Sequence, residues 1–153
     1  MTLAHELAAL LRRDLTKFVQ ELSAFPDGQL WERLPGVANS AGNLALHLEG
    51  NLREYIGRQL GGIAFKRERP LEFSTTGLPL ADLVSRIEHV KETIPEVVAA
   101  LSAETLDATY PENVLGVPLS TKQFIIHLLG HLNYHLGQIN YLRRILTAFV
   151  ARA

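Results

Sequence analysis

The sequence predicts an all-α protein, and more narrowly a four-helix bundle that occupies residues 1–153 as a single domain. Two observations predict this fold class. Four segments, each of roughly 20 to 30 residues, carry apolar side chains at the three- and four-residue spacing of an amphipathic helix. Each segment is also bounded by residues that commonly start or stop helices.

The first two predicted helices have clear ends. The first runs from about residue 2 to 24, and Pro26 and Gly28 follow it. The second runs from about residue 40 to 60, with Ser40 as its N-cap because a serine hydroxyl accepts a hydrogen bond from an unpaired amide of the first turn. Gly61 and Gly62 stop this helix, and a polar loop from residue 66 to 77 is expected after it.

The third predicted helix runs from about residue 79 to 101, with Pro79 in its first turn, where a missing amide hydrogen costs nothing. Residues 108–118 are expected to form an irregular connection with a short extended pair. The fourth helix begins at Ser120 or Thr121, because Ser120 and Gln123 match a capping box, and it ends near Phe149. The second and third links, of about 16 to 18 residues, are long enough to be crossovers, so an up-down-up-down order is not required.

Composition narrows the classes of function. The formal net charge is −1, from 15 basic and 16 acidic residues, and the basic tract at residues 66–69 offers little to a nucleic acid. Neither a signal peptide nor a membrane span is predicted, so we expect a cytoplasmic protein without nucleic-acid or membrane partners. The sequence has no cysteine, so any transition metal would be bound by imidazole, carboxylate or water.

Three of the six histidines recur at four-residue spacing on the fourth predicted helix, at His127, His131 and His135. Residues four apart share a helix face with Cα atoms about 6 Å apart, so two neighbouring imidazoles can converge on one ion. His127 and His135 are separated by about 12 Å of helix rise and cannot share an ion. A single site therefore uses either the 127/131 or the 131/135 pair and needs a further ligand.

The best candidate for that further ligand is His47, which lies mid-helix among leucines. Asn43 and Asn51 flank it at one turn on either side and form a polar face on an apolar helix, where bundles often place metal and ligand sites. Three histidines with an open position for water resemble a catalytic zinc site. The alternative interpretation is that these histidines are core residues that bind backbone carbonyls.

Two segments resemble a known family. The segment from His127 to Gln138 resembles the last-helix motif of the DinB/YfiT-like superfamily of metal-dependent proteins, and the segment from Asn39 to Leu48 resembles the start of that family's second helix. Trp31 and the segment from Arg69 to Phe73 also match, so the similarity covers most of the chain.

The resemblance implies an up-down-down-up four-helix bundle with one divalent metal ion, zinc or nickel, bound by His47, His131 and His135. It thereby selects the 131/135 pair. It also implies a homodimer. Many members carry a basic residue directly after the last ligand, where this chain has Leu136.

The leading hypothesis for function is a metal-dependent enzyme, either a hydrolase or a thiol S-transferase, in which the metal activates water or a thiol of a small molecule. The sequence identifies no catalytic residue. Asn43, Asn51 and Gln138 are candidate pocket or ligand-supporting residues, with interhelical hydrogen bonding as their alternative role. His127 is either a partner of a ligand or a packed residue. The competing hypothesis is a non-catalytic, stress-related, dimeric metal-binding module.

Overall fold

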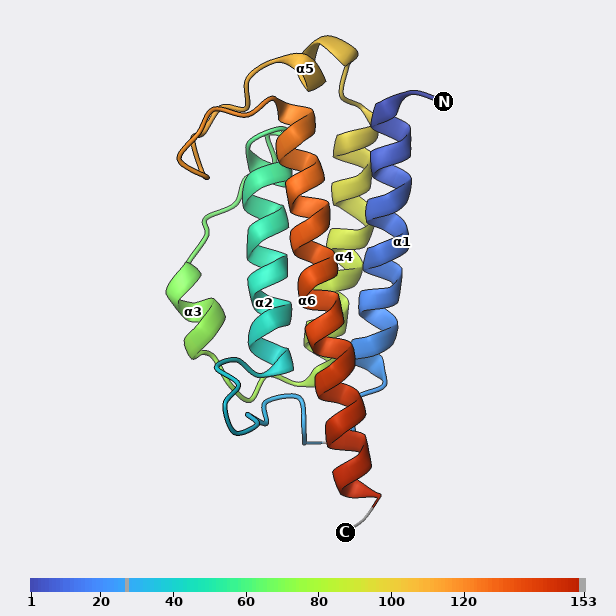
Figure 1. The fold of residues 1–153 in the computed structure, drawn as a ribbon, viewed down its shortest axis with the longest axis vertical. Helices are drawn as coiled ribbons and strands as arrows, with labels where there is room; N and C mark the ends of the chain where they lie inside the picture. The colour runs from blue at the N-terminus through green and yellow to red at the C-terminus, as the bar shows by residue number, and fades with distance from the viewer. Residues whose placement is uncertain (27, 152–153) are drawn as a thin grey trace.

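Four long helices lie side by side in the computed structural model, which describes residues 1–26 and 28–151 (Figure 1). They are α1 (Leu3–Ser23), α2 (Ala41–Leu52), α4 (Leu80–Ala99) and α6 (Thr121–Val150). Two short helices, α3 (Arg69–Ser74) and α5 (Ala103–Asp107), lie in the links between them. The described residues contain no β-strand beyond one isolated antiparallel bridge between Thr109 and Ser120. The predicted helical class is therefore confirmed.

The predicted caps account for the observed starts of two helices. The hydroxyl of Ser40 accepts a hydrogen bond from the amide of Asn43 at the start of α2. Ser120 and Gln123 form the reciprocal capping box at the start of α6. These bonds satisfy amides that have no partner within the helix, and they define where the two histidine-bearing helices begin.

Helix α2 does not end as an α-helix. Its last turns continue as a π-helix, η1, over Arg53–Arg58, so the chain keeps its direction but shifts its side chains around the axis. The spacing of apolar residues predicted a single helix to about residue 60 and did not distinguish this change.

Each of the long helices α1 and α2 packs against the other two, α4 and α6. Figure 1 shows α1 and α6 running in one direction and α2 and α4 running in the other. The two histidine-bearing helices, α2 and α6, are therefore antiparallel neighbours. No helix of the described residues combines the length and apolarity needed to cross a membrane.

Apolar side chains from all four long helices meet in one core. The largest fully buried side chains are Phe18, Phe124, Leu11, Leu15, Leu22, Leu48, Leu52, Ile56, Leu83, Ile87, Ile94 and Ile125. Burial of such side chains is the main favourable contribution to folding and gives the site a rigid frame.

The predicted polar loop at residues 66–77 is wrong in one respect, because it contains the short helix α3. Asn43, fully buried on α2, attaches this helix: its Nδ2 donates to the carbonyl of Glu72 at 3.1 Å and to that of Thr75 at 2.9 Å. A side chain therefore replaces backbone pairing as the connection between α3 and the bundle. This attachment brings the side chain of Glu72 against α2.

We expect Asn43→Ala to lower the free energy of unfolding by about 1–3 kcal/mol, because it leaves two carbonyls of the α3 segment without their donor. Chemical denaturation followed by circular dichroism measures this change. Asn140→Ala is the control, since Asn140 is half-buried and its side chain donates to Glu21 near the helix surface. An equal effect of the two substitutions would contradict the role given to Asn43.

Candidate metal centre

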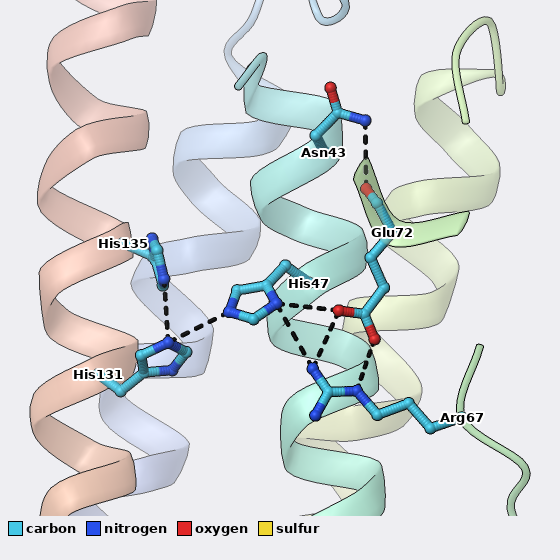
Figure 2. A network of polar contacts seen from close by, with 6 residues as sticks. All are labelled: Asn43, His47, Arg67, Glu72, His131 and His135. Carbon is cyan, nitrogen blue, oxygen red and sulfur yellow. Dashed lines mark hydrogen bonds and ion pairs between the residues drawn. The ribbon is translucent and has the colours of Figure 1, made fainter. Parts of the chain in front are cut away.

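His47 of α2 and His131 and His135 of α6 point their rings toward one another (Figure 2). Nε2 of His131 lies 3.2 Å from Nε2 of His47 and 3.0 Å from Nε2 of His135. One ligand atom from each of the three lies within 4.8 Å of the others, and His47 is buried while the other two are half-buried. The structure thus brings together the three histidines that the family resemblance implies.

The nitrogen spacing fits a metal ion. Imidazole nitrogens at about 2.0 to 2.1 Å from a tetrahedral zinc ion lie about 3.3 Å apart. The two Nε2 separations of 3.0 and 3.2 Å are close to that value. Nitrogen lone pairs of neutral imidazoles that face one another at this distance repel, and a shared cation would convert that repulsion into attraction. The donor set of three imidazoles also suits zinc and nickel.

Glu72 orients His47. Its Oε2 lies 2.9 Å from Nδ1 of His47, and because an ionised carboxylate only accepts hydrogen bonds, Nδ1 carries the proton and donates. The lone pair of His47 is then on Nε2, which faces the other two histidines. Carboxylates commonly hold metal-binding histidines in this way. The ring of Phe73 packs beside His47 with centroids 5.1 Å apart and restricts its rotation.

Arg67 keeps Glu72 ionised. Its Nε donates to Oε1 at 2.6 Å and its Nη2 donates to Oε2 at 2.9 Å, which makes a bidentate ion pair. Burial alone would raise the pKa of the Glu72 carboxyl, but the hydrogen bonds from His47 and Arg67 outweigh burial and lower that pKa below its ordinary value. Glu72 is therefore ionised at neutral pH and can accept the hydrogen bond from Nδ1 of His47.

The two histidines of α6 are held less strongly. Nδ1 of His135 lies 2.6 Å from Oε1 of Gln138, one turn further along α6. An amide oxygen only accepts hydrogen bonds, so Nδ1 carries the proton and donates to it. Burial, followed by the nearby His135 and His47, lowers the pKa of His131 to about 4. Burial also lowers the pKa of His135. Both rings are thus neutral at pH 7, the form that binds metals.

The remaining predicted residues have distinct positions. Asn43 does not reach the three imidazoles and binds the backbone of α3 instead, which is a structural role. Gln138 supports His135 directly. Asn51 is buried, and its Oδ1 has no hydrogen-bond partner within the described residues. His127 is exposed and outside the three-histidine group, with its ring stacked between Phe124 and His131.

Sequence reasoning missed the roles of Glu72 and Arg67. Glu72 lies within a segment that resembles the family but has no role predicted from the sequence. Arg67 enters the sequence analysis only as part of the basic tract at residues 66–69. The sequence did contain one indication, which is an arginine and a glutamate five residues apart in a protein with an expected metal site. Their burial depends on α3, which periodicity did not predict.

A helical protein with a three-histidine centre between two antiparallel helices is the class that this geometry defines. A family model described as the DinB superfamily matches residues 9–139. The chain therefore belongs to the DinB superfamily.

A solved structure supports the same fold. The chain is similar to the crystal structure of a DinB-like protein from Bacillus cereus ATCC 10987, with 20% sequence identity and a TM-score of 0.66. The match covers 86% of this chain and 84% of that one. No protein with a curated description matches the sequence.

Gly50 offers a test of the Glu72 support that leaves every ligand in place. It lies on α2 one turn from His47, and a methyl group there would be 2.9 Å from Cδ of Glu72 and 3.4 Å from Nε of Arg67. We expect Gly50→Ala to displace the carboxylate and weaken metal binding by about 10- to 100-fold, measured by isothermal titration calorimetry with zinc.

Gly130→Ala is the matched control. Gly130 precedes His131 on α6, and a methyl group there would meet nothing within 4 Å. We expect the zinc affinity to be unchanged by this substitution. Unchanged affinity in Gly50→Ala, with helix content retained by circular dichroism, would show that Glu72 does not support the site.

Proposed function

We propose that this protein is a metal-dependent enzyme that binds one divalent ion, zinc or nickel, through His47, His131 and His135. The observation that carries the proposal is the convergence of three Nε2 atoms, two of whose rings are held from behind by Glu72 and Gln138. A site assembled only for packing would not need its rings aimed at one point. Three ligands from the protein leave room for a further one, which is typical of catalytic rather than structural sites.

A divalent ion held there would act as a Lewis acid and lower the pKa of a water or a thiol that reaches the open position. The two reaction classes that we propose are accordingly hydrolysis and thiol S-transfer to a small molecule. The residues of the chain orient the histidine rings and keep them neutral. Glu72 and Gln138 fix the rings of His47 and His135, and burial lowers the pKa of His131 and His135 so that they stay unprotonated.

The same proposal includes an up-down-down-up four-helix bundle and a cytoplasmic location. The helix directions in Figure 1 and the contacts of α1 and α2 with α4 and α6 support the bundle. Fractionation of cells that express the untagged protein tests the location.

The test of metal binding is elemental analysis of protein purified without a histidine tag. We expect about one zinc or nickel ion per chain, and a loss of that ion in His131→Ala, because two remaining imidazoles do not make a catalytic site. Metal far below one per chain after reconstitution would contradict the proposal. Turnover is then measured with an electrophile and bacillithiol, mycothiol or glutathione, and separately with ester substrates.

A non-catalytic, stress-related, dimeric metal-binding module is the second candidate function. The observation that favours it is a row of exposed apolar side chains on α6, formed by Ile126, Tyr134, Tyr141 and Ile145. At about 100° per residue these four positions share one face of the helix. Gly130 and Gly137 lie on the same face, and a methyl group at either would meet nothing within 4 Å, so the backbone there is open to a second copy of the chain.

We expect the protein to sediment as a dimer in analytical ultracentrifugation, and Tyr141→Lys to shift it toward the monomer, since a charge at this 65% exposed position opposes burial against a partner. A metal-loaded dimer without turnover on any of the substrates above would favour the second function. A wild-type monomer at micromolar concentration would contradict the dimer.

A further inference from the structure

A cavity of about 300 Å³ lies directly beside His47 and His131. Its wall is built by α2 and η1, by the segment that leads into α3, by the loop after α5 and by the start of α6. The cavity shares two of its lining residues with the metal centre. A molecule that occupied it would therefore lie next to the ion.

The charged side chains that line this cavity are arginines. Arg67 and Arg69 line it, and no aspartate or glutamate does so among the described residues. Arg69 is exposed and forms no ion pair or hydrogen bond within the described part of the chain. Arg67 uses Nε and Nη2 on Glu72, while its Nη1 makes no hydrogen bond there. Both guanidinium groups thus retain donors for an anion.

A neighbouring cavity, which Glu72 lines, has a different charge pattern. Three glutamates line that cavity together with Arg53, Arg86 and Lys66, so its charges balance. Of these two cavities, only the one beside His47 and His131 is lined by arginines without a carboxylate.

Asn51 supplies an independent observation. Its side chain lines the cavity, its residue is only 7% exposed, and its Oδ1 has no hydrogen-bond partner within the described residues. A buried acceptor without a partner costs about 1–3 kcal/mol, and a donor group on a bound molecule would remove that cost. Asn51 also lies one turn from His47 on α2.

Much of the remaining lining is apolar. It is formed by Val114, Leu115, Phe124 and Leu128, of which Leu115 is 45% exposed. At about 30 Å³ per water-sized group, the volume accommodates roughly ten non-hydrogen atoms. A lining that combines two arginines with apolar side chains suits a molecule with an anionic end and a hydrocarbon body.

We propose that this cavity binds the substrate of the metal centre and that the substrate is a small organic acid. Its carboxylate is bound by Arg67 and Arg69, its apolar body lies against Leu115 and Phe124, and Oδ1 of Asn51 is left to accept a hydrogen bond from a donor group of the same molecule. The assignment of the molecule as substrate rests on the proposed metal-dependent function, whereas the binding of the carboxylate rests only on the side chains of the cavity.

Three probes separate the two ends of the ligand. Phenylacetate has the size, the ring and the charge, phenylacetamide keeps the ring without the charge, and acetate keeps the charge without the ring. Each is titrated into the zinc-loaded chain and into the chelator-treated chain, with binding followed by amide chemical shifts in NMR spectra. We expect phenylacetate to bind about tenfold or more tightly than either analogue in both forms.

Arg69→Gln and Lys66→Gln are the matched variants. Both remove one positive charge from the same segment, but the side chain of Lys66 is 90% exposed and lies outside the cavity. We expect Arg69→Gln to weaken phenylacetate about tenfold and to leave phenylacetamide unchanged, and Lys66→Gln to alter neither. Leu115→Ser is expected to weaken both aromatic probes and not acetate.

Equal affinity for phenylacetate and phenylacetamide would overturn the proposal, as would equal losses in Arg69→Gln and Lys66→Gln. Phenylacetate binding that appears only with zinc and ignores Arg69→Gln would show that the carboxylate binds the ion alone, which overturns the cavity but leaves the metal centre intact. Selective phenylacetate binding to a chain that takes up no metal would instead retain the carboxylate site and reject the metal-dependent function.

Discussion

The hydrogen bond from His47 to Glu72 is the contact on which the rest of the site depends. It fixes the proton on Nδ1 and so directs the lone pair of Nε2 toward α6. It also joins α2 to α3, a helix of only six residues that could not hold its position alone. The hydrogen bonds from His47 and Arg67 together keep the pKa of the buried carboxyl low, and the ion pair of Arg67 and Glu72 therefore belongs to the same unit. The orientation of His47, the position of α3 and the ion pair with Arg67 thus all depend on Glu72.

The sequence predicted the parts of this structure that are set by regular spacing. The starts of the two histidine-bearing helices followed from Ser40 and Ser120, and their faces followed from helical periodicity. His131 and His135 meet because residues four apart share a helix face. Choosing this pair over 127/131 required the resemblance to a family, since spacing alone treats the two pairs alike. The exposed position of His127 explains why it does not join the group.

The parts that were missed depend on contacts between distant segments. Helix α3 is too short to show a period, and it persists because Asn43, 29 residues before Glu72, donates to its backbone. The charged residues from position 66 to 69 look solvated along the chain, yet Arg67 is largely buried against Glu72. The π-helix at Arg53–Arg58 likewise leaves no local signature, because its register is decided by what its side chains pack against.

The three candidate ligands differ in the hydrogen bonds that support their rings, so the two sides of the site are not equivalent. His47 is backed by an anion, His135 by the neutral amide of Gln138, and Nδ1 of His131 has no hydrogen-bond partner among the described residues. A carboxylate partner raises the basicity of a ligating imidazole more than an amide does, so electron donation to an ion would be strongest from α2. The negative charge of Glu72 lies behind His47, whereas the free guanidinium donors face the cavity on the other side. In the proposed site, an anionic molecule is attracted to the arginines that line the cavity and repelled by the carboxylate of Glu72 behind His47. The short segment of residues 67–72 would thus both support His47 and favour anionic molecules at the site.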